Sequence, residues 1–187
     1  MSRYVFKLRV DNQLSLVAPI ATAKVAAELF TLIDKDRDHL KPFLPWVQAT
    51  QTVEDEFNFL KRVLQAQAEG ETYMFLIEYD DQIVGTIDLH FVNTNHHRAE
   101  IGYWLASSHT GLGIMTRCVN TVTQYGFQTL DLNRIDIYCD VENVASNAVA
   151  KRSNYQFLAT QPAQVFQDNR YRDMNQYVML KRDFKED

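Results

Sequence analysis

The clearest candidate for chemistry in this sequence is a glycine-containing turn, Thr110-Gly111-Leu112-Gly113-Ile114-Met115. Residues without side chains let backbone N–H groups converge, and the start of a helix adds the positive end of its dipole. The turn is therefore a predicted seat for an anion, most naturally a phosphate. A helix start that needs tight packing would give the same pattern. A Walker loop is excluded because no Gly-Lys-Ser/Thr follows, and the third glycine of a dinucleotide fingerprint is missing.

The turn joins a predicted strand to a predicted helix. From Arg98 to Leu105, polar and small residues alternate with apolar ones, as in a buried strand. Beyond Ser107-Ser108 the pattern becomes that of an amphipathic helix, with one face formed by Leu112, Met115, Val119, Val122, Gly126 and Leu130. A strand that leads through a glycine turn into a helix would position the anion seat.

These residues resemble a known family. The strand A-E-I-G-Y-W-L and the turn H-T-G-L-G-I-M-T resemble the central strand and pyrophosphate loop of the GNAT acyl-CoA N-acyltransferases, most closely the RimJ/RimL-type protein N-terminal acetyltransferases. The segment V-E-N-V-A-S-N-A-V-A-K-R resembles the family's second coenzyme segment. The resemblance covers nearly the whole chain and implies one GNAT domain, residues 1–187, of the α/β (α+β) class. Its expected sheet is mixed, mostly antiparallel, of about seven strands, splayed at the central strand and flanked by helices.

The resemblance implies acetyl-CoA as co-substrate and no metal. Backbone N–H groups of residues 112–115 would bind the pyrophosphate. The coenzyme-binding residues that the resemblance implies are Trp104, Leu105, Ala106, Thr110, Gly111, Leu112, Gly113, Ile114, Met115, Thr116, Asn143 and Ser146. The family usually carries Gln or Arg at the position of Thr110 and Gly or Ala at that of Met115, so weaker coenzyme binding is expected.

The implied reaction is attack of a neutral primary amine on the thioester through a tetrahedral oxyanion. In the family, a bulge in the central strand, here near residues 104–106, supplies an N–H to the oxyanion and lets the pantetheine arm pair with exposed backbone. An α-amino group, with a pKa of about 8, asks less of a base than a lysine at about 10.4.

Glu100 is the candidate general base, because some GNAT enzymes carry a catalytic glutamate at this position. An ion pair with a neighbour such as Arg98 could instead occupy its carboxylate. RimL-type enzymes use another glutamate where this chain has Gln164-Val165. This departure leaves the base and the acceptor open.

Ser146 and Asn143 are the other candidates for the reaction. Ser146 matches the family serine that binds the coenzyme sulfur and can protonate the leaving thiolate, and Asn143 matches the asparagine that fixes the pantetheine arm. Helix capping alone could also explain the pair, since Asn143 is a good N-cap and Ser146 lies three residues further on.

Phe43, Trp46 and His90 are the candidate acceptor-binding residues. The segment L-P-W resembles the loop that flanks the acceptor cleft in RimJ/RimL-type enzymes, and the prolines of residues 39–46 exclude a regular helix. Phe43 and Trp46 could equally close the hydrophobic core. His90, His96 and His97 lack Cys or carboxylate ligands at suitable spacing, so no metal site is predicted.

The remaining segments are predicted to support the site. Thr22 and Thr52 are helix caps, and the charged run at 34–38 is expected to be a solvated surface. The other predicted elements are a strand pair or one bent strand over 4–20, helices over 23–33 and from 52 to about 70, strands at 73–79, 83–92 and 134–140, a helix at 141–152, and a hairpin of strands 153–166 and 171–180.

Composition indicates a compact globular protein. Hydrophobic residues make up 46% of the 187 residues, and the net charge of −5 argues against general nucleic-acid binding while suiting a cationic substrate. Without a signal peptide or a run of ~18 apolar residues, a cytoplasmic protein that does not bind membranes is expected. Cys118 and Cys139 are expected to be reduced packing residues.

Three functions are compatible with the sequence. The first is acetylation of a protein N-terminus, where the resemblance points to a ribosomal protein. The second is acetylation of a small amine such as a polyamine, an aminoglycoside or an amino-acid derivative. The third is an acyl-CoA-binding protein without catalysis, suggested by Thr110 and the missing glutamate. A homodimer is compatible with the family.

Overall fold

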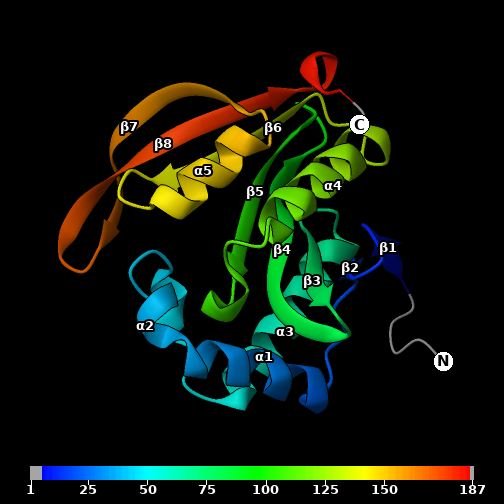
Figure 1. The fold of residues 1–187 in the computed structure, drawn as a ribbon, viewed down its shortest axis with the longest axis vertical. Helices are drawn as coiled ribbons and strands as arrows, with labels where there is room; N and C mark the ends of the chain where they lie inside the picture. Colours follow the sequence, from blue (N-terminus) through cyan, green and yellow to red (C-terminus); the bar gives the residue numbers. More distant parts are fainter. Residues whose placement is uncertain (1–5, 186–187) are drawn as a thin grey trace. The chain divides into compact units, whose positions relative to one another are not determined.

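The computed structural model describes residues 6–185, which divide into two compact units. The first unit comprises the residues up to Asp88 together with Tyr103–Ile114, and the second comprises Leu89–Gly102 together with the residues from Met115. Figure 1 follows the chain from blue to red through both units. The expectation of one domain over 1–187 stays a prediction.

The strands are β1 (Lys7–Arg9), β2 (Leu14–Val17), β3 (Tyr73–Tyr79), β4 (Gln82–Asn93), β5 (Arg98–Leu105), β6 (Arg134–Asp140), β7 (Gln156–Gln167) and β8 (Arg170–Leu180). The α-helices are α1 (Ala23–Lys35), α2 (Arg37–Leu40), α3 (Val53–Ala68), α4 (Ile114–Gln128) and α5 (Val144–Arg152). Three short 3-10 helices are η1 (Pro45–Gln48), η2 (Ser107–His109) and η3 (Lys181–Asp183).

The strands form one mixed sheet with the order β1-β2-β3-β4-β5-β6-β8-β7. The pair β5–β6 is parallel, whereas β1–β2, β2–β3, β6–β8 and β7–β8 are antiparallel. The sheet has eight strands rather than about seven, because the N-terminal segment forms two strands and not one bent strand. The turn between them is fixed by Asp11, whose Oδ1 accepts N–H bonds from Gln13 and Leu14 at 2.8 and 2.9 Å. The predicted residues 4 and 5 lie outside the described part of the chain.

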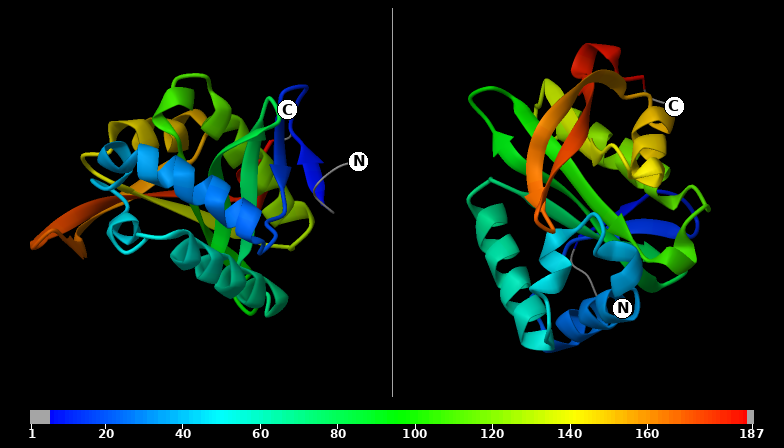
Figure 2. Two further views of the ribbon diagram at one scale, coloured as in Figure 1. Left: turned by 90° about the horizontal axis from the view of Figure 1, so that it is seen from below. Right: turned by 90° about the vertical axis from the view of Figure 1, so that its left-hand side faces the viewer.

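In the first unit, α1 and α3 pack against each other (Figures 1 and 2). The predicted cap of α1 is confirmed, because Val25 N–H donates to Thr22 Oγ1 at 3.3 Å. At the start of α3 the Thr52 hydroxyl accepts from Asp55 N–H at 3.1 Å while the Asp55 carboxylate accepts from Thr52 N–H at 2.8 Å. This reciprocal capping box confirms the second predicted helix start.

Glu56, one residue beyond that box, gives a prediction for stability against pH. The side chain is buried, and burial raises the pKa of its carboxyl from 4.5 to about 7, although the positive charge of Arg62 lowers this pKa. Because the folded state binds this proton more tightly than the unfolded chain, the free energy of unfolding should fall as pH rises from about 4.5 to about 7. Glu56→Gln should abolish this fall and stabilise the protein by about 3 kcal/mol at pH ~8.

Urea unfolding at several pH values checks this expectation. Glu54→Gln is the matched control, since Glu54 is exposed in the same helical turn and its removal should leave the fall in place. An unchanged fall in Glu56→Gln would show that other groups cause it.

The helix after the glycine turn begins later than its sequence pattern suggests. It starts at Ile114, and Leu112, expected on its buried face, is 54% exposed. The reason is Gly113, whose φ of 70° is incompatible with an α-helical residue. Further along, a Cβ at Gly126 would lie 2.8 Å from Ile135 Cδ1, so this glycine permits close packing of α4 on β6.

The second unit ends in the predicted hairpin of β7 and β8, orange to red in Figure 1. Asp168 and Asn169 form its turn with φ of 50° and 58°, the backbone of a two-residue hairpin loop. The helix expected from 141 begins only at Val144, because Asn143 caps it.

Three further observations concern predicted classes of site. Among residues 6–185, no helix combines the length and apolar character that crossing a bilayer requires. The same residues contain no group of three or more His, Cys, Asp or Glu side chains that could hold a metal ion. Cys118 and Cys139 are buried thiols.

Candidate active site

The glycine turn (residues 110–114) has the backbone that an anion seat needs. Gly111 and Gly113 have φ of 79° and 70°, in the left-handed region that favours glycine. A Cβ at either position would meet no atom within 4 Å. Tight packing therefore does not explain these glycines, and that interpretation of the sequence is wrong. They set a backbone conformation and leave open space at the N-terminus of α4, where the helix dipole favours negative charge.

The end of β5 lies directly against β4 in the first unit. A Cβ at Gly85 would lie 2.2 Å from the carbonyl oxygen of Trp104, so only glycine fits there. Ala106 N–H donates to Val84 O at 2.8 Å just beyond the strand. Residues 104–106, the predicted source of the oxyanion donor, are thus held by the β4 backbone. Gly85 was not singled out from the sequence, although a lone glycine in a strand pattern signals such a close approach.

The aromatic loop (residues 43–46) also belongs to the first unit. Trp46 is 38% exposed and Phe43 is half-buried, whereas Val47, which follows Trp46, is buried. The Trp46 ring lies 6.2 Å from the ring of Trp104 at an angle of 55°. An exposed indole beside the strand end is an apolar surface, and its role in binding the acceptor stays a prediction.

In the second unit, the predicted base Glu100 lies beside His90. Glu100 Oε2 and His90 Nε2 are 3.7 Å apart, and each side chain is about one-third exposed. Within the described residues Glu100 forms no ion pair with Arg98, so the alternative in which Arg98 occupies the carboxylate is wrong. The charge of Glu100 also reaches Tyr138. The pKa of the Tyr138 phenol is raised mainly by burial and further by the negative charges of Asp136 and Glu100.

The parallel pairing of β5 with β6 is short. It joins residues 98–100 to residues 134–136, whereas β6 stays paired to β8 through Asp140. Glu100 therefore lies at the last paired position, opposite Asp136. Within the described residues, the pairing of β6 with β8 continues beyond this point to Asp140.

At the start of α5, Asn143 and Ser146 perform the structural roles that their spacing allowed. Ser146 N–H donates to Asn143 Oδ1 at 3.0 Å, so Asn143 is the N-cap. The Ser146 hydroxyl lies 3.1 Å from the thiol of Cys139 on β6. The hydroxyl is thus adjacent to a sulfur atom, and the sequence-based role at the coenzyme sulfur stays a prediction.

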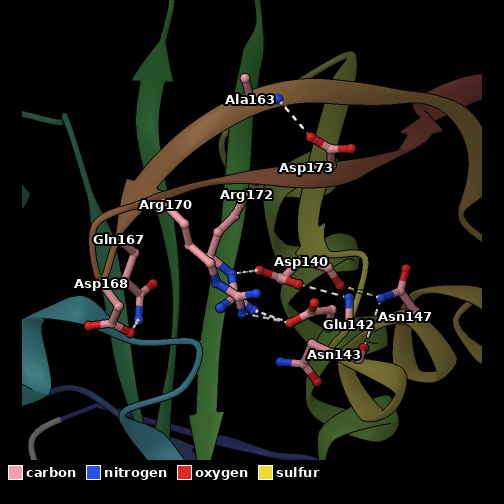
Figure 3. A network of polar contacts seen from close by, with 10 residues as sticks. All are labelled: Asp140, Glu142, Asn143, Asn147, Ala163, Gln167, Asp168, Arg170, Arg172 and Asp173. Carbon is pink, nitrogen blue, oxygen red and sulfur yellow. Dashed lines mark hydrogen bonds and ion pairs between the residues drawn. The ribbon is translucent and has the colours of Figure 1, made fainter.

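A polar network fixes this segment to the hairpin (Figure 3). Arg172, on β8, forms an ion pair with Asp140 at the end of β6, and both side chains are at least nine-tenths buried. Arg172 also binds Glu142 at 3.0 Å, and Glu142 binds the exposed Arg170 at 2.9 Å. The chain between β6 and Asn143 is therefore anchored by charges that sequence patterns did not reveal.

Asn147 completes the anchoring from one turn into α5. Its Nδ2 donates to the carbonyl oxygens of Asp140 and Asn143, both at 2.8 Å. Its Oδ1 accepts from Asn175 Nδ2 and from the Tyr177 hydroxyl, also at 2.8 Å. A buried amide with its hydrogen bonds satisfied on both atoms rigidly orients the helix start.

The predicted site residues fall into both units, and their roles stay predictions. The first unit contains Trp104, Leu105, Ala106, Thr110, Gly111, Leu112, Gly113, Ile114, Phe43 and Trp46, and the second contains His90, Glu100, Met115, Thr116, Asn143 and Ser146. Met115 is buried, so its contribution to a ligand would come from its backbone.

This arrangement of strand, glycine turn and helix agrees with a known family. The sequence pattern of the acetyltransferase (GNAT) domain matches residues 16–156. The chain belongs to the GNAT acetyltransferase family. The mixed, mostly antiparallel sheet is that of the GNAT fold.

The GNAT acetyltransferase is similar to ribosomal-protein acetyltransferases. It is 31% identical to the ribosomal-protein-serine acetyltransferase of Escherichia coli (strain K12) over 152 residues, which cover 81% of this chain and 85% of that protein. The structure of RimL, the ribosomal L7/L12 alpha-N-protein acetyltransferase, in complex with coenzyme A is 26% identical, with 94% and 98% of the two chains covered and a TM-score of 0.89. The Salmonella typhimurium enzyme that modifies the N-terminal serine of L7/L12 is 26% identical, with 94% and 99% covered and a TM-score of 0.84. These findings confirm the RimJ/RimL-type resemblance.

Proposed function

We propose that this GNAT acetyltransferase acetylates the N-terminal α-amino group of a protein, with a ribosomal protein that begins with serine as the first candidate. The observation that carries the proposal is the similarity to the ribosomal-protein-serine acetyltransferase over most of both chains. The chemistry agrees, because an α-amine with a pKa of about 8 needs only a modest base.

In the proposed reaction, the amine nitrogen forms a bond to the thioester carbon and the carbon–sulfur bond breaks. The amine loses its proton to Glu100, directly or through a water molecule, and His90 lies 3.7 Å from this carboxylate. A backbone N–H of residues 104–106 stabilises the oxyanion. The thiolate leaves and receives a proton from the Ser146 hydroxyl, which regains one from solvent, and Asn143 orients the pantetheine arm.

The coenzyme pyrophosphate binds the N–H groups at the glycine turn and the start of α4. Gly113→Ala should raise the Kd of acetyl-CoA about tenfold, because a side chain at a φ of 70° costs ~1–2 kcal/mol and the turn would relax away from its binding geometry. Isothermal titration calorimetry measures this Kd. Gly70→Ala is the matched control, since Gly70 has a φ of 78° after α3 and outside the turn. Equal Kd values for both variants would remove the turn from the coenzyme site.

Thiol release from acetyl-CoA tests the function. Two peptides that begin with serine serve as acceptors, one with a free N-terminus and one with a blocked N-terminus. Release with the free peptide alone supports N-terminal acetylation. Release with neither peptide, but with a polyamine or an aminoglycoside, would assign the enzyme to small amines instead, and coenzyme binding without turnover on any amine would indicate a non-catalytic acyl-CoA-binding protein.

The proposal includes the cellular location of the enzyme and its oligomeric state. Acetylation of ribosomal proteins places it in the cytoplasm, without direct contact with nucleic acid or membranes. A homodimer is part of the proposal from the resemblance to the family, and sedimentation as a monomer at assay concentrations would count against it.

A further inference from the structure

A run of charged residues after α1 contains two members that differ from their neighbours. Asp34, Lys35 and Asp38 are exposed, as the sequence suggested, but Asp36 and Arg37 are half-buried. Charged groups that lose contact with water require partners. The prediction that the whole run is a solvated surface is therefore wrong for these two residues, and their partners lie in two different parts of the first unit.

Asp36 holds the segment that leads into the glycine turn. Its Oδ2 accepts from Ser107 N–H and its Oδ1 from the Ser107 hydroxyl, both at 2.6 Å. The carbonyl oxygen of Ser107 in turn accepts from the Thr110 hydroxyl at 2.8 Å and from Thr110 N–H at 3.2 Å. The Asp36 carboxylate therefore fixes Ser107, and through it Thr110, which immediately precedes Gly111.

Arg37 holds the segment that follows the aromatic loop. Its Nη1 donates to Val47 O at 2.7 Å and its Nη2 to Thr50 O at 2.6 Å, while Nε donates to Asp34 Oδ1 at 2.8 Å. These two carbonyl oxygens lie at and just beyond η1, the 3-10 helix that contains Trp46. The planar guanidinium is suited to this task, because its donors diverge in a fixed geometry.

The segment that leads into the glycine turn and the aromatic loop also contact each other directly. The rings of Trp46 and Trp104 are 6.2 Å apart, and Trp104 lies two residues before Ala106 and three before Ser107. The contacts thus form a closed circuit from Asp36 through Ser107 to Trp104, across to Trp46, and back through η1 to Arg37. Because the two charged residues are adjacent in the chain, a displacement of one segment is transmitted to the other.

We propose that Asp36 and Arg37 are positioning residues that couple the binding of acetyl-CoA to the binding of the acceptor amine. The inference rests on the proposed function, which assigns the glycine turn to the coenzyme and the aromatic loop to the acceptor. When acetyl-CoA orders the turn, Asp36 and Arg37 hold Trp46 in the arrangement that receives the acceptor. By linkage, the acceptor increases the affinity for acetyl-CoA by the same factor.

Crossed effects distinguish this coupling from a local structural role. Arg37→Met removes the bonds to the aromatic-loop side and the ion pair with Asp34, and it leaves the Asp36 contacts with Ser107 in place. It should nevertheless raise the Kd of acetyl-CoA at least fivefold. Asp36→Ala removes contacts to the glycine-turn side only, yet it should raise the KM of a serine-starting peptide by a similar factor. Asp36→Asn, which keeps one acceptor oxygen, should recover part of this loss. Asp38→Ala is the matched control, because Asp38 is exposed in the same run and, within residues 6–185, pairs with Lys41 at 2.6 Å rather than with either segment.

Calorimetric titration of acetyl-CoA into each variant decides the first effect without any acceptor, so it remains valid if the peptide is not a substrate. Peptide KM values at saturating acetyl-CoA decide the second. Failure of the peptide assay in the unaltered protein would count against the proposed function, whereas an unchanged Kd of acetyl-CoA in folded Arg37→Met would overturn the coupling. The coupling is likewise overturned if each variant weakens only the ligand on its own side, or if Asp38→Ala has the same effects.

Discussion

Replacing Glu100 by Gln should lower kcat for a serine-starting peptide by about 10²–10⁴-fold, the usual contribution of a general base. The amide cannot accept the proton that the amine must lose for the attack, while its shape preserves the strand. The KM of acetyl-CoA should change little, because Glu100 lies on β5 and outside the glycine turn. The loss should shrink between pH ~7 and ~9, since more of an α-amine with a pKa of about 8 is then already neutral.

Two variants isolate the role of the carboxylate. Arg98 carries the nearest charge on the same strand and, within the described residues, forms no ion pair with Glu100. Arg98→Gln should therefore leave kcat within about twofold. His90→Gln should lower kcat by less than Glu100→Gln does, because it removes the neighbour of the base and leaves the base itself. A Glu100→Gln enzyme with nearly full kcat at pH ~7 would assign proton removal to another group.

The sequence predicted the fold well where the determining interactions are local. A change of period from two to about 3.6 located β5 and α4, and the cap residues Thr22 and Thr52 located the starts of α1 and α3. The errors are also local. Leu112 fitted the helical period, but the positive φ of Gly113 delays the helix by two residues.

Interactions between distant segments were not visible in the sequence. Asp36 and Ser107 are 71 residues apart in the chain, so the charged run looked like ordinary surface. Gly85 carried a weak signal as a lone glycine within a strand, but its closeness to the carbonyl of Trp104 depends on strand register, which no local pattern specifies. Candidate residues for chemistry came from motifs, whereas the residues that position them came from the structure.

Arg172→Met should lower the free energy of unfolding by about 3–5 kcal/mol, the typical cost of breaking a buried ion pair by removing one partner. Asp140 is almost fully buried, and its remaining acceptor bond, from Glu142 N–H at 2.7 Å, satisfies only part of the charge. Methionine fills a similar volume, so the loss reflects the uncompensated carboxylate rather than a cavity. Urea unfolding at neutral pH measures the effect.

The matched control is Arg170→Met, which breaks only the exposed pair with Glu142 and should cost less than about 1 kcal/mol. A double variant, Asp140→Asn with Arg172→Met, should recover part of the stability, because no buried charge then remains without its partner.

The N-cap Asn143 follows Asp140 within three residues. Arg172→Met should therefore also disturb the start of α5 and lower kcat through Ser146. A double variant no more stable than Arg172→Met would show that the buried charge is not the source of the loss, because relieving Asp140 of its charge would then bring no gain.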